Sequence, residues 1–258
     1  VVVDCRLGLN NPDHGRNAYR TGRIPGAFFA DLDTDLAGPT GPGRHPLPNP
    51  EEFDRTLGGW GVTPQSTVVA YDDAGGSIAA RLWWMMTDQG HTDTFVLDGG
   101  IPEWVSTGHE TDSGDPTVGR TGPAGIATHE WRGTASIDDV VQRPERTSLI
   151  DARSPERYRG VTEPVDARPG HIPGALNVPT SDNLVDGRFR PLHELRNRYA
   201  ELGVDESSEV IAHCGSGVTA CHDILAMEVA GLPRARLYVG SWSEWASTDH
   251  PASTGDRP

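Results

Sequence analysis

Short apolar runs alternate along the chain with longer stretches in which apolar residues recur at helical spacing. Residues 148–150, 209–212 and 236–239 are runs of three or four mostly apolar residues, typical of strands buried on both faces of a parallel sheet. Residues 219–230 have helical periodicity, and Gly231 follows as a stop signal. This alternation predicts an α/β fold with a doubly wound, mostly parallel sheet. Ligands of such sheets bind beyond the carboxyl ends of the strands.

The chain also repeats itself, with three segments recurring in the same order at offsets between 141 and 148 residues. The repeated pairs are residues 22–27 and 170–175, residues 4–6 and 151–153, and residues 99–109 and 240–250. Three matches at nearly one spacing indicate two homologous domains far more strongly than any single match.

We therefore expect two α/β domains, residues 1–107 and residues 129–258, joined by a linker over residues 108–128. The linker segment is rich in Gly, Pro and Asp and lacks apolar periodicity. The second copy has a helix-like lead-in over residues 136–141, whereas the first copy starts inside the corresponding strand. We therefore expect native residues to precede Val1.

The composition argues against a membrane protein and against a nucleic-acid-binding protein. A chain of 258 residues with 35% hydrophobic residues can bury two ordinary cores. We expect no membrane association and a cytoplasmic location, because no apolar run approaches about 18 residues and no signal peptide is visible. The formal net charge is −15 and every basic residue is Arg, which argues against nucleic acid as a partner. A GC-rich genome and adaptation to high salt both remain open as reasons for the missing Lys.

The candidate chemistry lies in the segment from His213 to Cys221, which reads HCGSGVTAC. Cys214 follows a strand-like run and precedes a helix-like one. Backbone N–H groups of a Gly-containing loop and the start of a helix stabilise an anion, so we expect a Cys214 thiolate to act as a nucleophile. A small buried cysteine in an ordinary turn is the alternative. Cys221 and Cys5 are interpreted as core residues, and His213 as a structural histidine on the opposite side of the strand.

The first copy lacks this nucleophile. Asp72 stands opposite Cys214 at an offset of 142 residues, and a carboxylate cannot replace a soft sulfur nucleophile. We therefore expect the first domain to be catalytically silent and to form one side of a cleft.

Together these features resemble the tandem-domain rhodanese superfamily of sulfurtransferases over essentially the whole chain. The resemblance rests on GHIPGA at residues 170–175, the Asp-x-Arg at residues 151–153, the Cys214 loop and the closing GSWSEW at residues 240–245. The loop is similar to that of mercaptopyruvate sulfurtransferases. Thiosulfate-specific rhodaneses typically carry basic residues where Gly215 and Ser216 stand here.

The resemblance implies that Cys214 takes a sulfur from mercaptopyruvate as a persulfide and passes it to cyanide or a thiol, such as thioredoxin or a low-molecular-weight thiol. Thiosulfate as the donor is the alternative. Neither a metal nor an organic cofactor is implied. The expected anion-binding loop consists of Gly215, Ser216, Gly217, Val218 and Thr219.

The resemblance also implies residues that bind the donor. Arg157 and Arg168 match the two arginines that clamp its carboxylate, for which a planar guanidinium is suited. Asp33 and His45 resemble residues that family members direct into the cleft, with surface positions as the alternative. Ser216 is expected to donate a hydrogen bond to the substrate or persulfide, with simple loop polarity as its alternative.

Two other functions use a similar cysteine loop. A cysteine phosphatase needs an arginine six residues after the nucleophile to clamp phosphoryl oxygens, and Ala220 occupies that position. A non-catalytic sulfur-binding module is the other, and the intact Cys214 loop argues against it.

Overall fold

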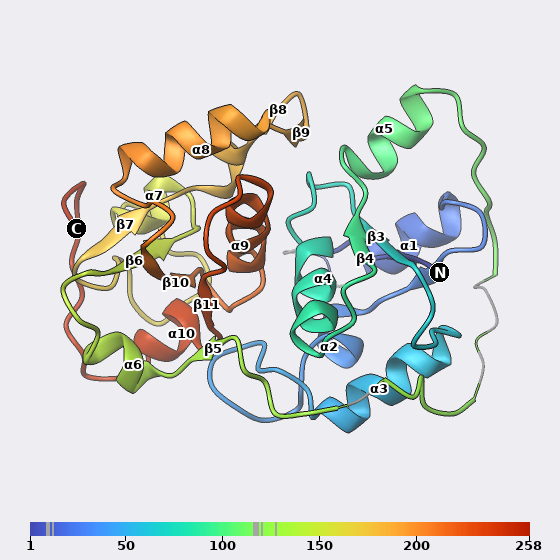
Figure 1. Cartoon of the computed structure of the whole chain (residues 1–258), viewed down its shortest axis with the longest axis horizontal. Helices are drawn as coiled ribbons and strands as arrows, with labels where there is room; N and C mark the ends of the chain where they lie inside the picture. The colour runs from blue at the N-terminus through green and yellow to red at the C-terminus, as the bar shows by residue number, and fades with distance from the viewer. Residues whose placement is uncertain (9–10, 12, 116–118, 120, 127) are drawn as a thin grey trace. The chain divides into compact units, whose positions relative to one another are not determined.

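The computed structural model describes the chain except for residues 9–10, 12, 116–118, 120 and 127 (Figure 1). Its contacts divide the chain into two compact units. Unit 1 comprises Val1–Pro39 and Leu47–Arg132, and unit 2 comprises Thr40–Pro46 and Gly133–Pro258. The short segment Thr40–Pro46 therefore belongs to unit 2, although its sequence lies within the first copy.

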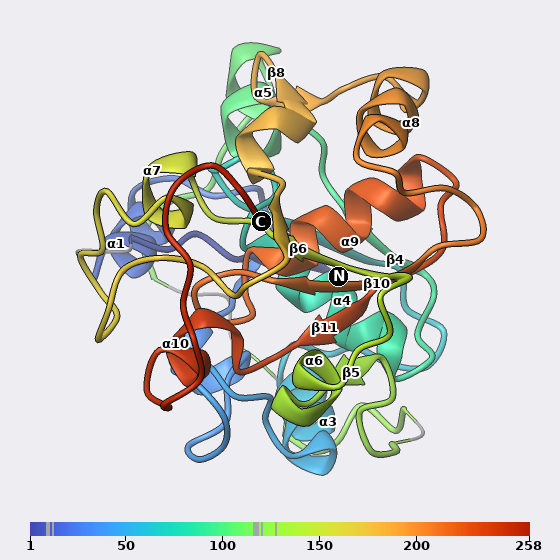
Figure 2. The same cartoon turned by 90° about the vertical axis from the view of Figure 1, so that its left-hand side faces the viewer.

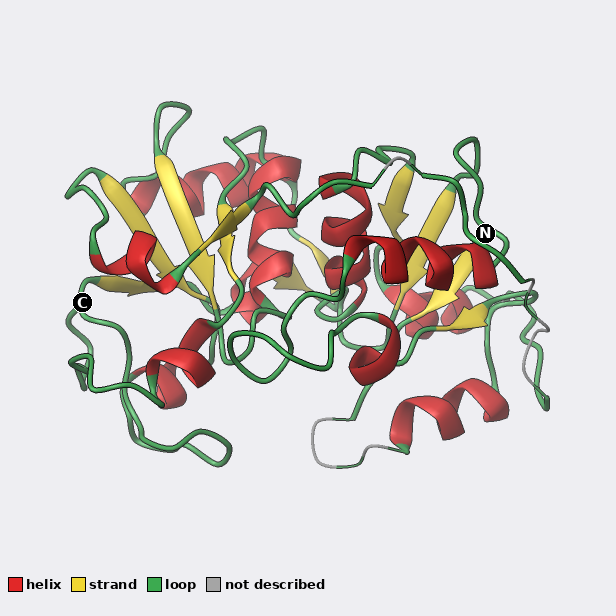
Figure 3. Ribbon diagram, turned by 90° about the horizontal axis from the view of Figure 1, so that it is seen from below, coloured by secondary structure: helices red, strands yellow, loops and turns green. Residues whose placement is uncertain are grey.

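Unit 1 contains a four-stranded sheet of order β2-β1-β3-β4 in which every pairing is parallel (Figure 3). Its strands are β1 (Val2–Asp4), β2 (Phe28–Phe29), β3 (Val68–Tyr71) and β4 (Thr94–Val96). Its helices are α1 (His14–Thr21), α2 (Leu32–Asp35), α3 (Pro50–Gly59), α4 (Ala79–Asp88) and α5 (Gly100–Ser106). Tyr19 of α1 and Ile101 of α5 pack with Tyr71 of β3 in one apolar cluster.

Unit 2 contains a five-stranded parallel sheet of order β5-β11-β10-β6-β7 and a separate antiparallel pair, β8 and β9. The strands are β5 (Thr134–Ala135), β6 (Thr147–Asp151), β7 (Ala175–Asn177), β8 (Leu184–Val185), β9 (Arg188–Phe189), β10 (Glu209–His213) and β11 (Arg236–Tyr238). The helices are α6 (Ile137–Val141), α7 (Pro155–Tyr158), the 3₁₀ helix η1 (Thr180–Asn183), α8 (Leu192–Glu201), α9 (Ala220–Val229) and α10 (Ser241–Trp245).

The sheet of unit 2 is covered on both faces, as its apolar strands predict. Helices α8 and α9 lie on one face, and α6 and α10 on the other (Figure 2). The α10 side packs Trp242 and Trp245 against Leu149 and Ile211 of the central strands. The predicted α/β class and parallel sheet are confirmed. The helix expected over residues 219–230 is α9, and Gly231 ends it with a φ of +71°.

The internal repeat is visible as one motif built twice. At the end of β1, Arg6 donates from its backbone N–H and its guanidinium to Asp4, and at the end of β6, Arg153 binds Asp151 in the same way. Both carboxylates are fully buried. Because a buried carboxylate needs a hydrogen-bonded partner, the Asp-x-Arg spacing is a structural requirement of each sheet.

Described residues of the predicted linker pack on unit 1. Asp112 forms an antiparallel bridge with Arg23, and the Asp54 carboxylate accepts hydrogen bonds from the backbone N–H groups of Gly125 and Ile126. The contacts thus assign this segment to unit 1 as far as Arg132. Five positions of the predicted linker, 116–118, 120 and 127, lie outside the described residues.

Helix α9 carries a buried carboxyl group that gives a prediction about stability. One oxygen of Asp223 accepts a 2.6 Å hydrogen bond from the Asn183 amide, and the other has no hydrogen-bond partner among the described residues. Burial raises the pKa of Asp223 to about 7. Because the folded state holds this proton more tightly than the unfolded chain, the group's contribution to stability is full below about pH 4 and is lost as the pH rises to about 7.

We expect Asp223→Asn to remove this dependence. The free energy of unfolding of the variant should match that of the parent near pH 4 and exceed it at pH 8 by roughly 4 kcal/mol, three pKa units at 1.36 kcal/mol each. Urea unfolding of both proteins between pH 4 and pH 8 measures the difference. A variant that gains nothing at pH 8 would contradict the prediction.

Candidate active site

Cys214 stands directly after β10, the middle strand of the unit 2 sheet, and the loop 214–219 leads from it into α9. Its backbone N–H donates to Ser241 Oγ at 3.2 Å, and its carbonyl accepts from the N–H of Trp242 at 3.0 Å. Only 1% of the residue is exposed. The predicted strand, loop and helix are thus found, with the cysteine held from both sides at the carboxyl end of the sheet.

Two glycines allow the loop its path. Gly217 has a φ of +76°, and a Cβ there would lie 2.4 Å from the carbonyl oxygen of Val239, so a larger residue would meet both strain and a clash. At Gly215 a Cβ would lie 3.3 Å from Arg157 Nη1 and 3.3 Å from Arg44 Nη2. Two guanidinium groups therefore lie against the residue that follows Cys214.

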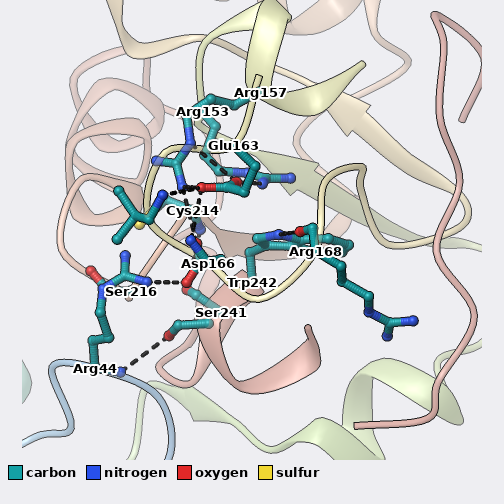
Figure 4. A network of polar contacts seen from close by, with 12 residues as sticks. Arg44, Arg153, Arg157, Glu163, Asp166, Arg168, Cys214, Ser216, Ser241 and Trp242 are labelled. Carbon is teal, nitrogen blue, oxygen red and sulfur yellow. Dashed lines mark hydrogen bonds and ion pairs between the residues drawn. The ribbon is translucent and has the colours of Figure 1, made fainter. Parts of the chain in front are cut away.

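Arg157 comes from the short helix α7 and is held by two carboxylates (Figure 4). Its Nη2 lies 2.7 Å from Glu163 Oε1 and 3.0 Å from Asp166 Oδ2. Its side chain remains 22% exposed. The sequence-based prediction selected this arginine, and the structure brings it to the loop.

Sequence reasoning missed Arg44, which lies in the segment Thr40–Pro46 of unit 2. Gly43 packs closely against Gly240, where a Cβ would lie 2.5 Å from the carbonyl oxygen, and the N–H of Arg44 donates to Ser243 Oγ at 3.1 Å. The Arg44 guanidinium then forms an ion pair with Asp166. The available signal was an arginine directly before His45, a residue that the resemblance had already selected.

His45, from the same segment, is brought to the Cys214 loop. Its Nδ1 lies 2.7 Å from Ser216 Oγ, so the two side chains share a hydrogen bond. This places the predicted His45 and Ser216 beside one another, 171 residues apart in the sequence. The pair can hold the loop hydroxyl in a fixed direction.

Arg168 is not brought to the loop. Its Nη2 donates to the carbonyl oxygens of Trp245, at 3.2 Å, and His250, and Figure 4 shows its guanidinium pointing away from Cys214. Asp33 lies in α2 of unit 1, where its N–H donates to Asp31 Oδ1 at 3.1 Å.

The polar groups beneath Cys214 are structural. His213 is fully buried, its Nε2 lies 3.8 Å from Asp151 Oδ2, and burial lowers its pKa. The pKa of Asp151 is held at about 2; burial opposes this shift, and the charges of Arg153 and His213 produce it. The Arg153 guanidinium lies 4.7 Å from the ring centroid of Trp242. These contacts fix the end of β10 and the start of α10 relative to each other.

The same loop in unit 1 already contains an anion. Asp72 accepts four hydrogen bonds of 2.8 to 2.9 Å from the backbone N–H groups of Ala74, Gly76, Ile78 and Ala79. A strand followed by this loop and a helix therefore builds a nest of converging amides. The counterparts of the first three amides in unit 2 belong to Ser216, Val218 and Ala220.

We expect Asp72→Asn to destabilise unit 1. The asparagine side chain has an NH₂ group in place of one carboxylate oxygen, so the backbone N–H groups that this oxygen accepts from would lose their acceptor and face another donor. Hydrogen bonds to a charged acceptor are worth about 1.5–3 kcal/mol each and are not additive, so the loss should be about 2–4 kcal/mol. Hydrogen exchange of the residue 74–79 amides and urea unfolding measure it. The neighbouring Asp73→Asn is the matched control, and equal behaviour of the two variants would refute the prediction.

Within the described part of the chain, no three His, Cys, Asp or Glu side chains are grouped as a metal site requires. No described helix is long and apolar enough to cross a membrane.

A family model described as the rhodanese-like domain matches residues 1–107 and again residues 136–248. The chain belongs to the rhodanese family. The repeat, the parallel sheets and the Cys214 loop are therefore two rhodanese-like domains in tandem, as the resemblance implied.

Individual rhodaneses match nearly the full length of this chain. A Pseudomonas aeruginosa protein named "Probable 3-mercaptopyruvate sulfurtransferase" is 41% identical, covering 99% of this chain and 93% of that protein. A Mus musculus "Thiosulfate sulfurtransferase" is 37% identical over 95% and 84% of the two chains. The solved 3-mercaptopyruvate sulfurtransferase of Leishmania major superposes with a TM-score of 0.80 at 36% identity, covering 95% of this chain and 69% of that one.

Proposed function

We propose that this rhodanese transfers a sulfane sulfur from 3-mercaptopyruvate, through a persulfide on Cys214, to a thiol or cyanide. The observation that carries the proposal is a cysteine at the carboxyl end of β10 with the guanidinium groups of Arg157 and Arg44 against the next residue. The names of the full-length relatives support a sulfurtransferase and include both donors.

The first half-reaction begins with the donor carboxylate on Arg157 and Arg44. We assign the second clamping position to Arg44 because its guanidinium lies against Gly215, whereas that of Arg168 lies on backbone carbonyls away from the loop. The Cys214 thiolate attacks the donor sulfur, an S–S bond forms, and the C–S bond breaks with its electron pair left on carbon as the pyruvate enolate. The enolate takes up a proton to give pyruvate, and the enzyme retains the persulfide.

The persulfide is an anion, and the Cys214 loop suits it. Amides of the loop from Gly215 to Thr219 and the start of α9 provide donors without a countercharge. The occupied amide nest around Asp72 in unit 1 supports this reading. Ser216, hydrogen-bonded to His45, supplies a hydroxyl for the donor or the persulfide. In the second half-reaction the acceptor thiolate or cyanide attacks the outer sulfur and Cys214 leaves as the thiolate.

The positions of the positively charged side chains favour mercaptopyruvate over thiosulfate as the donor. Positions 215 and 216 are Gly and Ser, so no loop side chain offers a cation beside the sulfur, as a thiosulfate dianion would favour. The arginines come instead from α7 and from the segment Thr40–Pro46. This arrangement fits a ligand with its carboxylate some bonds away from its sulfur.

Other parts of the proposal concern the rest of the chain. The first domain is non-catalytic, with Asp72 in place of the nucleophile, and Asp33 contributes to substrate binding. The acceptor is a thiol such as thioredoxin or a low-molecular-weight thiol, and the protein works in the cytoplasm. Three cysteines, all free and buried, support a reducing compartment.

Initial rates with each donor, using cyanide as the acceptor, test the choice. We expect kcat/KM to be higher for mercaptopyruvate than for thiosulfate. The opposite order would assign the protein to the thiosulfate branch and leave the persulfide mechanism intact.

A further inference from the structure

Asp166 forms a bridge between the two arginines of the site. Its Oδ2 lies 3.0 Å from Arg157 Nη2, and its Oδ1 forms an ion pair with Arg44 Nη1. The side chain is only 3% exposed. Figure 4 shows Asp166 together with both arginines. One carboxylate oxygen on each guanidinium is the arrangement that a ligand carboxylate would adopt between these residues.

The arginines around the loop already have carboxylate partners within the chain. The ion pairs join three arginines and three carboxylates: Arg44, Arg153, Arg157, Asp151, Glu163 and Asp166. A donor carboxylate added to this network would be a fourth carboxylate beside three guanidinium groups. Because like charges repel at such short range, binding is favoured when one of the three carboxylates gives way.

Asp151 and Glu163 are both fixed by contacts with groups other than Arg44 and Arg157. Asp151 is tied to Arg153 within the sheet motif. Glu163 accepts hydrogen bonds from the backbone N–H groups of Val165 and Asp166, and its contacts with Arg157 lower its pKa against the opposing effect of burial. The pKa of Asp166 is instead raised by burial, despite the charge of Arg44. Among the described residues, the Asp166 carboxylate is held by Arg44 and Arg157 alone.

Asp166 also has room to move. A cavity of about 500 Å³ is lined by Arg44, Asp166 and Ser243. The loop that carries Asp166 exposes Val161 and Val165 to solvent, so little apolar packing holds it in place.

We propose that Asp166 is an internal carboxylate that occupies the Arg44 and Arg157 pair in the absence of a donor and is displaced by the donor's own carboxylate. Asp166 thereby sets the affinity for anionic donors. The inference rests on the proposed function, since it assigns the two arginines to the donor.

Equilibrium binding tests the exchange without turnover. In a Cys214→Ser background, we expect Asp166→Asn to lower the Kd of pyruvate roughly tenfold, measured by calorimetry, and to leave the weak binding of uncharged methyl pyruvate unchanged. Asp256→Asn, which removes an 84% exposed carboxylate paired with Arg159, controls for net charge. In the Cys214 enzyme, Asp166→Asn should lower KM for mercaptopyruvate by a similar factor with kcat within about twofold.

A role for Asp166 in positioning the arginines would have the opposite sign. An unchanged or higher Kd for pyruvate in Asp166→Asn, with a fold intact by circular dichroism, would overturn the proposal, and Asp166→Ala repeats the test should Asn disturb the loop. Full turnover by Cys214→Ser would instead refute the persulfide mechanism, while the calorimetric comparison would still report on the exchange.

Discussion

Cys214→Ser should abolish turnover with either donor. A serine hydroxyl neither ionises near neutral pH nor accepts a sulfane sulfur, so both half-reactions stop. We expect a loss of at least about 10⁴-fold in kcat, the scale seen when a covalent nucleophile is removed. Mass spectrometry after donor treatment should show the mass of one added sulfur on the parent and none on the variant.

A matched control is available in Cys221, which is also buried and lies seven residues further along. Cys221→Ser removes a thiol whose sulfur contacts the carbonyl of Gly217. After donor treatment this variant should still show the mass of one added sulfur, and its kcat should stay close to that of the parent. Sulfur uptake by Cys214→Ser would show that another group is the carrier.

Arg157→Gln should lower kcat/KM for mercaptopyruvate by roughly 10²-fold, because loss of one partner of a buried charge pair costs about 2–5 kcal/mol. Most of the effect should appear in KM, since the donor carboxylate lies away from the bond that breaks. The KM for thiosulfate should rise much less. Steady-state kinetics with both donors measure the split.

Arg159→Gln is the control, two residues along the chain. Arg159 pairs with Glu156 and Asp256 at the surface, so its loss should change neither KM beyond about twofold. An equal rise in both values of KM for Arg157→Gln would indicate a structural role for this arginine.

The fold was predictable because the strands of each sheet are buried on both faces. Runs such as 209–212 and 236–239 then read as apolar, and the helix between them follows a helical period with a glycine stop. Cys214 was predictable for a related reason. A loop between a parallel strand and a helix places its residues at the carboxyl edge of the sheet.

The arginine pair was only half predictable. Arg157 follows the Asp-x-Arg motif closely, so local alignment sufficed. Arg44 reaches the loop through a Gly- and Pro-rich segment without periodicity, and its contact with Ser243 spans 199 residues. Arg168 was selected by the resemblance alone, and the structure places its guanidinium on the carbonyl oxygens of Trp245 and His250.

The segment Thr40–Pro46 makes unit 2 depend on the first copy, because it lies in the first copy by sequence and in unit 2 by its contacts. Excision of the first copy would also remove Arg44 and His45 from unit 2, the unit that contains Cys214. A cut at the boundary between the repeats would therefore leave unit 2 without the segment that contacts the Cys214 loop.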